Sequence, residues 1–530
     1  MSRFSGKLAR AVVAGALLSA TACSDLLDVG NKQNPETDRV LATPADVEAL
    51  IRDSYIQAKQ PLLSADGINM QLGSVAFENS STAANFGMIE RSAFPRAAIL
   101  NQTSNQFHPE YYEVWAGSYA AIRAAADGLA KLAEPSFSLG SAVSDARAEA
   151  FARFVLFFAH ANLAITYDQA SILDETIPAS EVRPLEAYGD VMTAALGYAD
   201  DAIQIATANP TITFPADWMG TEMSATRFIQ VVNSFKARYR TQVARTPAER
   251  TAVDWNAVLA ETNGGITTDY AVTDDDNRFD FWMHDYMSFR GAWHQVPYFI
   301  MGMADTSGAY QTWMADANIM SRTPIVIQTP DLRFPQGNTL VAQQAAPGRN
   351  LRAKTNSTGE AGWLRPERGT WRWSNYIDKR YQAYYDATNA GVPLPIIQVK
   401  ETQLIKAEAL YRTNDIPGAL AIINGYRTTD GGLPAATVAG APGGNACVPK
   451  LPNGSCGDVL ETLKWEKRMI NFMTVYGGFY FDSRGWGDLA TGTFLHYPVP
   501  ARELEVRQQP LYTFGGVGGP GAAPAGTYLY

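Results

Sequence analysis

The sequence predicts a mainly α-helical protein in which pairs of helices support a loop-rich, aromatic-rich part. Two observations predict this fold class. Apolar residues recur at helical spacing in two long blocks of the chain, at about 44–264 and about 398–475. Between these blocks, at about 265–397, the helical periodicity is lost, and Gly, Pro and Asn are scattered among six of the eleven tryptophans.

The first 22 residues have the features of a secretory signal peptide. Basic residues precede a short apolar run, which ends in small residues directly before Cys23. The run is too short to span a bilayer, which needs about 20 apolar residues. A cysteine at this position resembles the lipobox of bacterial lipoproteins, so we expect cleavage before Cys23 and an acyl (palmitate-type) membrane anchor on it. An ordinary cleaved signal with a chance cysteine is the alternative. Residues 23–43 are expected to form a polar, lipidated tether.

The first block is expected to begin its helices at Thr43, which suits an N-cap, and Pro44, which suits the first helical position. The stretch 151–158 is apolar nearly all round, which predicts a helix buried on most sides. Helical spacing continues through the block and predicts further helices at about 109–133, 146–168, 185–207, 224–245 and 252–262.

The second block predicts helices at about 398–413, 416–427 and 457–475. The first two of these form the clearest pair in the chain. Ala407 and Ala419 are small, Asn414 suits a turn, and Ile423 is bulky. This pattern is typical of the tetratricopeptide unit, in which small side chains let two helices approach and larger ones fill the groove to the next pair. The predicted fold class is therefore mainly α, with tetratricopeptide-like helical pairs.

The aromatic-rich middle segment is the candidate ligand-binding part. A tryptophan ring offers a rigid apolar face with a polar edge. A sugar presents C–H groups on one face and hydroxyls around its rim, so such rings suit glycan binding. Packing in the core or against a partner is the alternative reading of each ring. The candidates are Trp282, Trp293, Trp313, Trp363, Trp371 and Trp373.

The net charge of the chain bears on the class of partner that it can bind. The formal net charge of −10 argues against a nucleic-acid partner, which would require a basic stripe.

Beyond Cys23, the cysteines are Cys447 and Cys456, in a loop of Gly, Pro and Asn. An exported compartment permits a disulfide between them, and two ligands are too few for a metal site. We expect a disulfide that staples this loop, with two free thiols as the alternative.

Recognisable catalytic, metal and cofactor patterns are missing from the sequence. The five histidines do not form the zinc pattern of two per helix face, and His284 and His294 suit ordinary polar or packing roles. No Gly-x-Ser-x-Gly elbow or P-loop occurs. The cluster Asp274–Asn277 could bind calcium, but it lacks EF-hand spacing, and a solvated acidic turn is favoured. We therefore expect no enzyme activity, no cofactor and no metal, although two carboxylates suffice for a glycosidase.

Four segments together resemble the SusD/RagB family of surface lipoproteins. Lys467, Tyr476 and Gly485 depart from the residues usual in that family. The segments are Cys-Ser-Asp-Leu-Leu-Asp at 23–28, Gln-Leu-Ile-Lys-Ala-Glu-Ala at 403–409 with its continuation to Arg427, Trp-Glu-Lys-Arg at 465–468 with its continuation to Gly487, and Tyr-Pro-Val-Pro at 497–500 with its continuation to Leu504.

The resemblance implies one SusD-like domain over 44–530, closed by a C-terminal segment at 476–530. It implies a lipid-anchored protein of the cell outer membrane that faces the exterior. It further implies capture of an oligosaccharide, less often an oligopeptide, and its delivery to a SusC-like, TonB-dependent β-barrel transporter. The motifs at 403–427 and 466–504 hold the fold in that family. A scaffolding lipoprotein that binds protein partners through its repeats stays the alternative, and a glycoside hydrolase is less favoured.

Overall fold

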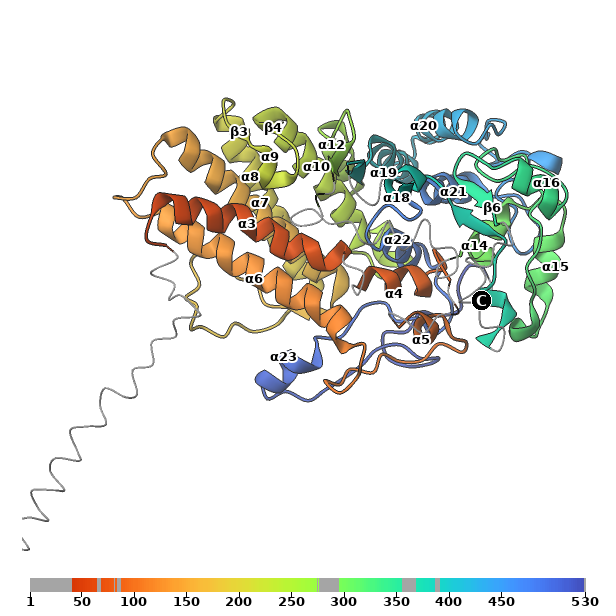
Figure 1. Ribbon diagram of the computed structural model, residues 1–530, viewed down its shortest axis with the longest axis horizontal. Helices are drawn as coiled ribbons and strands as arrows, with labels where there is room; N and C mark the ends of the chain where they lie inside the picture. The colour runs from red at the N-terminus through yellow and green to blue at the C-terminus, as the bar shows by residue number, and fades with distance from the viewer. Residues whose placement is uncertain are drawn as a thin grey trace, which may run out of the picture.

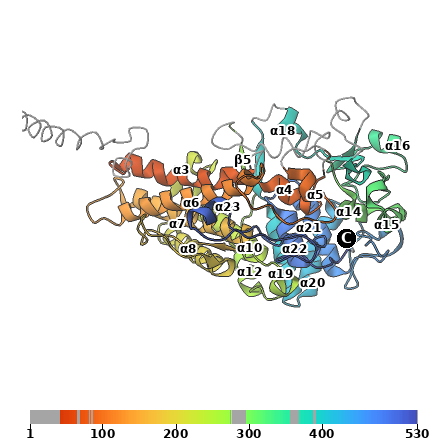
Figure 2. The same cartoon turned by 90° about the horizontal axis from the view of Figure 1, so that it is seen from below.

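The computed structural model describes residues 41–63, 68–80, 82, 87–273, 275, 295–354, 368–386 and 391–528. The molecule is elongated (Figures 1 and 2). Long N-terminal helices form one end, short helices and strands form the other, and the helices of the second block lie between them. The mainly α fold class predicted from the sequence is confirmed.

The N-terminal end is built from long helices that pack side by side. Thr43 caps the first of them, because its Oγ1 accepts the backbone N–H of Asp46 at 3.2 Å. Two short antiparallel ribbons connect the later helices, β1 (Gln169–Ala170) with β2 (Glu186–Ala187) and β3 (Thr213–Phe214) with β4 (Met223–Ser224). The long helices of this end are α3 (Pro44–Leu63), α6 (His108–Leu132), α7 (Ala142–Thr166) and α8 (Tyr188–Ala208). The other helices of the first block are α4 (Ile68–Val75), α5 (Met88–Ser92), α9 (Ala216–Met219), α10 (Ala225–Gln242), α11 (Pro247–Thr251) and α12 (Trp255–Asn263).

Helix α7 is the core of this end, as its apolar run predicts. It is long and apolar enough to cross a membrane by length and composition, but 89% of its most apolar window is buried inside the protein. Phe154 contacts the rings of Tyr55, Phe228 and Phe235, which come from α3 and α10. The apolar surface of α7 is therefore covered by the neighbouring helices.

The second block contains α19 (Val399–Arg412), α20 (Ile416–Thr429), α21 (Val459–Asn471) and α22 (Gly478–Trp486), followed by α23 (Ala501–Val506). The predicted pair is present: Ala407, Ala419 and Ile423 are fully buried in one cluster between α19, α20 and α21. Asn414 adopts a left-handed φ of 67° at the turn. The helix predicted over 457–475 is too long. It ends at Asn471, because Phe472 leaves the helical region with a ψ of 124°, and Met473 follows with a left-handed φ of 50°.

The two ends of the loop-rich part lie side by side in the fold. Strands β5 (Tyr270–Thr273) and β8 (Pro393–Ile397) pair antiparallel, with Tyr270 opposite Ile397. A second ribbon joins β6 (Leu351–Ala353) to β7 (Tyr376–Asp378). The described helices of this part are short: α14 (Tyr298–Met301), η2 (Gly302–Ala304), α15 (Ala309–Ala315), η3 (Ile319–Ser321), α16 (Leu340–Ala345), η5 (Thr370–Arg372) and α18 (Gln382–Asp386), with η6 (Gly444–Ala446) in the loop before α21.

Buried ion pairs join elements that are far apart in the sequence. Arg250 of α11 forms ion pairs with Glu408 of α19 and Asp482 of α22, and Lys467 of α21 shares Asp482. Gly485 lies directly against Arg250, where a Cβ would be 3.3 Å from its Cδ. The residues of these motifs are thus occupied in holding the helices together.

A similar cluster attaches the loop-rich part to α21. Arg333 forms ion pairs with Asp331 and with Glu466, and the indole N–H of Trp465 donates to Asp331 at 3.2 Å. All four side chains are buried. The start of the motif at 465–468 therefore fixes the orientation of the loop-rich part on the helices.

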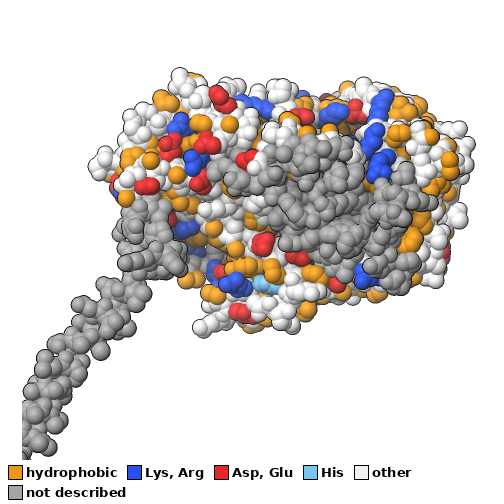
Figure 3. Space-filling view, viewed as in Figure 1, with side chains coloured by type: hydrophobic (Ala, Val, Ile, Leu, Met, Phe, Trp, Pro, Cys, Tyr) orange, Lys and Arg blue, Asp and Glu red, His pale blue; other side chains and the backbone are white. Residues whose placement is uncertain are grey.

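The surface carries charges of both signs. On the face seen in Figure 3, basic and acidic side chains lie side by side at the end formed by α3, α6, α7 and α8. This mixture agrees with the net charge of −10 and offers no basic stripe on that end of this face.

Candidate ligand-binding site

The tryptophans of the predicted binding region divide into three groups. Trp282, Trp293 and Trp363 lie outside the described residues, so their roles stay predictions. Trp313 and Trp371 are only 5% and 1% exposed. Trp373 is half-buried. An open ring face for sugar stacking is therefore not what Trp313 and Trp371 offer in this structure.

The burial of these two rings has a clear physical cause. The ring of Phe299 meets Trp313 at 5.1 Å and Trp371 at 5.7 Å, both edge to face. The guanidinium of Arg372 lies 4.2 Å from the centre of the Trp371 ring. The sequence shows where the tryptophans are, but it does not show that Phe299 and Arg372 pack against them, because the path of the loops cannot be read from it.

A groove of about 650 Å³ runs along α15, and this volume lies within the range usual for small-molecule sites. One wall is α15 itself, and the chain that returns from η3 forms the other. Trp313 lines the groove, although it is only 5% exposed. The lining residues are Ala309, Thr312, Trp313, Ala315, Asp316, Ser321, Arg322, Thr323 and Ile325.

Arg322 dominates the chemistry of the groove. Its guanidinium lies 4.9 Å from the centre of the Trp313 ring, and it donates to the backbone carbonyls of Met314 at 3.0 Å and Asp316 at 2.8 Å. These carbonyls belong to the C-terminal end of α15, where the helix dipole favours a cation. Desolvation lowers the pKa of Arg322, but the group stays a cation at neutral pH. The groove therefore presents a fixed positive charge.

The other polar groups of the groove suit a hydroxylated ligand. Thr312, Asp316, Ser321 and Thr323 are exposed along it. The indole N–H of Trp313 is buried and has no hydrogen-bond partner in the described part of the chain. Charged and hydroxyl side chains beside an apolar floor can bind hydroxyls and the C–H face of a ring at once.

The start of α15 is held rigidly. The buried carboxylate of Asp305 accepts the backbone N–H of Gly308 at 3.0 Å and of Tyr310 at 3.2 Å. Gly308 has a left-handed φ of 98°, which glycine adopts at no steric cost. The Tyr310 hydroxyl donates to the carbonyl of Phe299 at 2.6 Å. A wall fixed in this way is preorganised for binding.

The predicted disulfide is present and supports the same wall. Cys447 is bonded to Cys456. Within the loop that they close, Lys450 donates its backbone N–H to Met303, and its carbonyl and that of Leu451 accept from the Gln311 side chain of α15. The disulfide-closed loop thus supports α15, which forms one wall of the groove.

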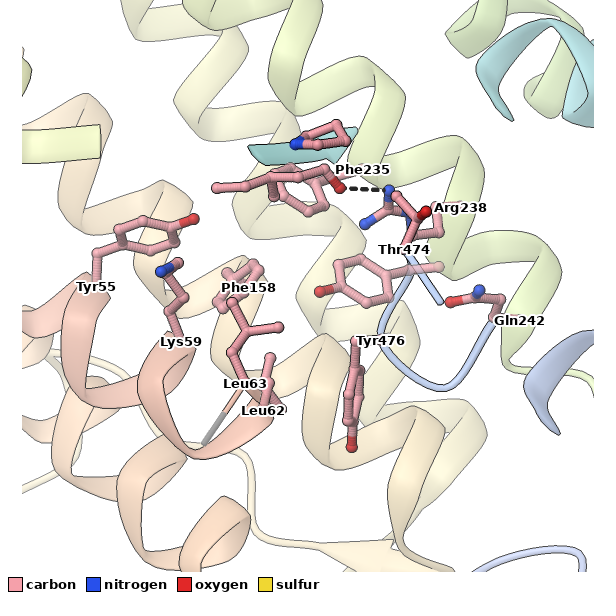
Figure 4. A pocket seen from close by; sticks show the side chains of 13 residues that line it. Tyr55, Lys59, Leu62, Leu63, Phe158, Phe235, Arg238, Gln242, Thr474 and Tyr476 are labelled. Atoms are coloured by element: carbon pink, nitrogen blue, oxygen red, sulfur yellow. Dashed lines mark hydrogen bonds between the residues drawn. The ribbon is translucent and has the colours of Figure 1, made fainter. Parts of the chain in front are cut away.

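A second cleft lies at the middle of the molecule, between α3, α7, α10 and the segment 474–476 (Figure 4). Its walls are rich in aromatic rings, among them Tyr55, Phe158 and Tyr476, and Arg238 donates across it to the carbonyl of Ile396 at 2.8 Å. Its volume is only about 40 Å³, which holds a few waters and no sugar ring. The groove beside α15 is therefore the better candidate.

Neither cleft resembles a catalytic centre. Asp316 is the one carboxylate among the lining residues of the groove, whereas glycoside hydrolysis requires a pair. Among the described residues, no cluster of three or more His, Cys, Asp or Glu could hold a metal. His284, His294 and the acidic cluster Asp274–Asn277, apart from Asp275, lie outside the described residues, as does Cys23.

Sequence reasoning missed Arg322, Asp316 and Thr312. No motif or periodicity points to them, because they come together only through the return of the chain after α15. The one available signal was the proximity of Trp313 in the sequence.

No family model and no curated protein matches this chain. Solved structures do. A SusD superfamily protein from Parabacteroides distasonis is 11% identical over 88% of this chain and 97% of its own, with a TM-score of 0.57. A SusD superfamily protein from Bacteroides vulgatus is 13% identical over 84% of this chain and 89% of its own, with a TM-score of 0.50. A SusD-like carbohydrate binding protein from the same species covers 92% of this chain and 94% of its own at 15% identity, with a TM-score of 0.49.

These similarities extend over both helical blocks and the loop-rich part, and they agree with the resemblance carried by the four sequence segments. This chain therefore has the fold of these SusD superfamily proteins.

Proposed function

We propose that this protein captures an oligosaccharide outside the cell and passes it, chemically unchanged, to a SusC-like, TonB-dependent β-barrel in the outer membrane. The SusD-like fold and the lipobox-like sequence before Cys23 support the proposal. The observation that carries it is the groove beside α15, which Arg322, Asp316, Trp313 and the hydroxyls of Thr312, Ser321 and Thr323 line together.

Calorimetry on the protein from Ser24 onward tests the binding step. We expect Asp316→Asn to weaken binding of an oligosaccharide about tenfold, the effect of losing one hydrogen bond to a charged group. Trp313→Phe should weaken it as well, because the smaller ring gives the Arg322 guanidinium, 4.9 Å from the centre of the indole, less support. Glu149→Gln is the matched control: Glu149 is exposed on α7, away from the groove, and its replacement should leave the affinity unchanged.

Three results would speak against this proposal. Shortening of the oligosaccharide during incubation would favour a hydrolase. Binding of oligopeptides alone would replace the ligand class. No binding across broad glycan and peptide panels would favour the scaffolding lipoprotein.

The anchor has its own test. We expect Cys23→Ser to move the protein from the membrane fraction of the cell envelope to the soluble fraction, because the acyl chains supply the membrane affinity. A fatty-acid analogue should label the wild type and not the variant. The labelled wild type, extracted in mild detergent, should co-purify with a TonB-dependent barrel. An unlabelled wild type and unchanged fractionation of the variant would contradict the lipid anchor.

A further inference from the structure

A third cavity, of about 310 Å³, shares no lining residue with the groove beside α15 or with the cleft of Figure 4. It is enclosed by the start of α11, the end of α22 and the C-terminal segment 523–527. Two arginines line it, Arg245 and Arg484. The remaining lining residues are Thr246, Pro247, Gly487, Leu489, Leu495, Ala523, Pro524, Ala525, Gly526 and Thr527.

The two guanidinium groups are buried without a carboxylate partner. Arg245 is 2% exposed and Arg484 is 1% exposed, and neither forms an ion pair with a described residue. Other buried arginines of this chain differ: Arg250 and Arg333 each form bidentate hydrogen bonds to a carboxylate. The carboxylate of nearby Glu249 accepts instead from the backbone N–H of Arg245.

The hydrogen bonds that Arg245 and Arg484 do form use their terminal nitrogens. Arg245 donates to the carbonyls of Ile165 and Tyr167 at the end of α7. Arg484 donates to Ile165 and, at 2.8 Å, to Gln242 at the end of α10. In both residues the Nε atom is buried and has no partner in the described part of the chain. Each of these two cavity-lining arginines thus keeps one N–H donor, on Nε, without a partner in the described part of the chain.

The two guanidinium groups lie close enough together to repel each other, and Glu249 is the carboxylate that acts on both. Burial and the mutual repulsion of the two guanidinium groups lower the pKa of Arg245 well below its usual value, and burial lowers the pKa of Arg484 to about 10. Burial together with both arginines also lowers the pKa of His496 to about 2. An anion in the cavity would relieve this repulsion.

We propose that this cavity binds a small organic carboxylate through Arg245 and Arg484. The terminal nitrogens of both residues already donate to backbone carbonyls, so a carboxylate would accept from the Nε–H groups and balance the two positive charges. The remaining walls are largely apolar, with Pro247, Leu489 and Leu495, and this favours an organic body over an inorganic ion. The inference does not depend on the groove beside α15.

Benzoate and benzamide test the proposal directly, because they differ in charge and hardly in shape. In calorimetry on the wild type, benzoate should bind with one site and at least about tenfold more tightly than benzamide, the effect expected of a charge-assisted pair. Sulfate should bind more weakly than benzoate. Equal binding of benzoate and benzamide, tighter binding of sulfate, or no binding of benzoate at millimolar concentration would each overturn the proposal.

Variants locate the site. Ala525→Trp should fill the cavity from its wall and abolish benzoate binding, with the circular dichroism spectrum and melting temperature retained. Arg484→Gln should weaken binding. Arg183→Gln is the matched control, since Arg183 is exposed and pairs with Glu181. Undiminished binding in folded Ala525→Trp protein would place the anion elsewhere and overturn the proposal.

Discussion

Replacing Glu408 with glutamine is expected to lower the free energy of unfolding by about 3–5 kcal/mol, the cost of leaving a buried charge without its partner. Glu408 accepts two hydrogen bonds from Arg250, at 2.9 and 2.6 Å, and both side chains are completely buried. The indole N–H of Trp486 donates to the same carboxylate at 3.0 Å. Asp482 alone would then have to balance both Arg250 and Lys467.

Urea denaturation measures this effect: the midpoint should fall while the slope stays unchanged, since the exposed surface is the same. Glu149→Gln, an exposed change of the same type, should lie within about 0.5 kcal/mol of the wild type. A Glu408→Gln variant as stable as the wild type would show that Arg250 finds another partner.

The same contact predicts a dependence on acid. Arg250 holds the pKa of Glu408 down, at about 2 against its ordinary 4.5, despite the opposing effect of burial. A carboxyl with a lowered folded-state pKa contributes stability above its unfolded pKa and loses it as the pH falls. The wild type should therefore lose this stability between about pH 4.5 and 2, and Glu408→Gln should lack that part of the loss.

The second large effect on stability comes from Glu78, and its dependence on pH is opposite to that of Glu408. Burial raises the pKa of the Glu78 carboxyl to about 8, although it accepts the backbone N–H of Met473 at 2.8 Å. The folded protein therefore holds a proton that the unfolded chain releases above its ordinary pKa of 4.5. Stability should fall as the pH rises from 4.5 to 8, with a slope of up to about 1.4 kcal/mol per pH unit.

Glu78→Gln removes this slope. Glutamine keeps the oxygen that accepts from Met473 and cannot ionise, so the variant should match the wild type near pH 5 and exceed its melting temperature at pH 8 and above. Melting temperatures recorded across this pH range check the prediction. Parallel curves for the two proteins would mean that Glu78 is ionised in the folded state.

Local patterns in the sequence predicted the helices well. The apolar run 151–158 predicted the buried helix α7, and the spacing of Ala407, Ala419 and Ile423 predicted the pair α19 and α20. The pairing of Cys447 with Cys456 followed from their loop and number. Each of these features depends on residues that are close in the chain, and helical periodicity reports them directly.

Contacts between distant segments were not predictable in this way. Arg250 and Glu408 are 158 residues apart, and nothing near either of them indicates the other. Trp313 and Trp371 were candidates for sugar platforms, with core packing as the alternative, and they pack around Phe299. The type of a ring can be read from a sequence, but its orientation cannot. Arg322 was missed for the same reason, since its role arises from the fold of a short return loop.

The antiparallel pairing of Tyr270 with Ile397 has a consequence for how such a protein can diversify. Both ends of the intervening segment leave the helical scaffold through adjacent strands, so an insertion into one of its exposed loops need not move either end. Each doubling of such an insertion adds only about 0.6 kcal/mol of closure entropy. Such a segment can gain new loops as long as Asp331 and Arg333 keep their contacts with α21.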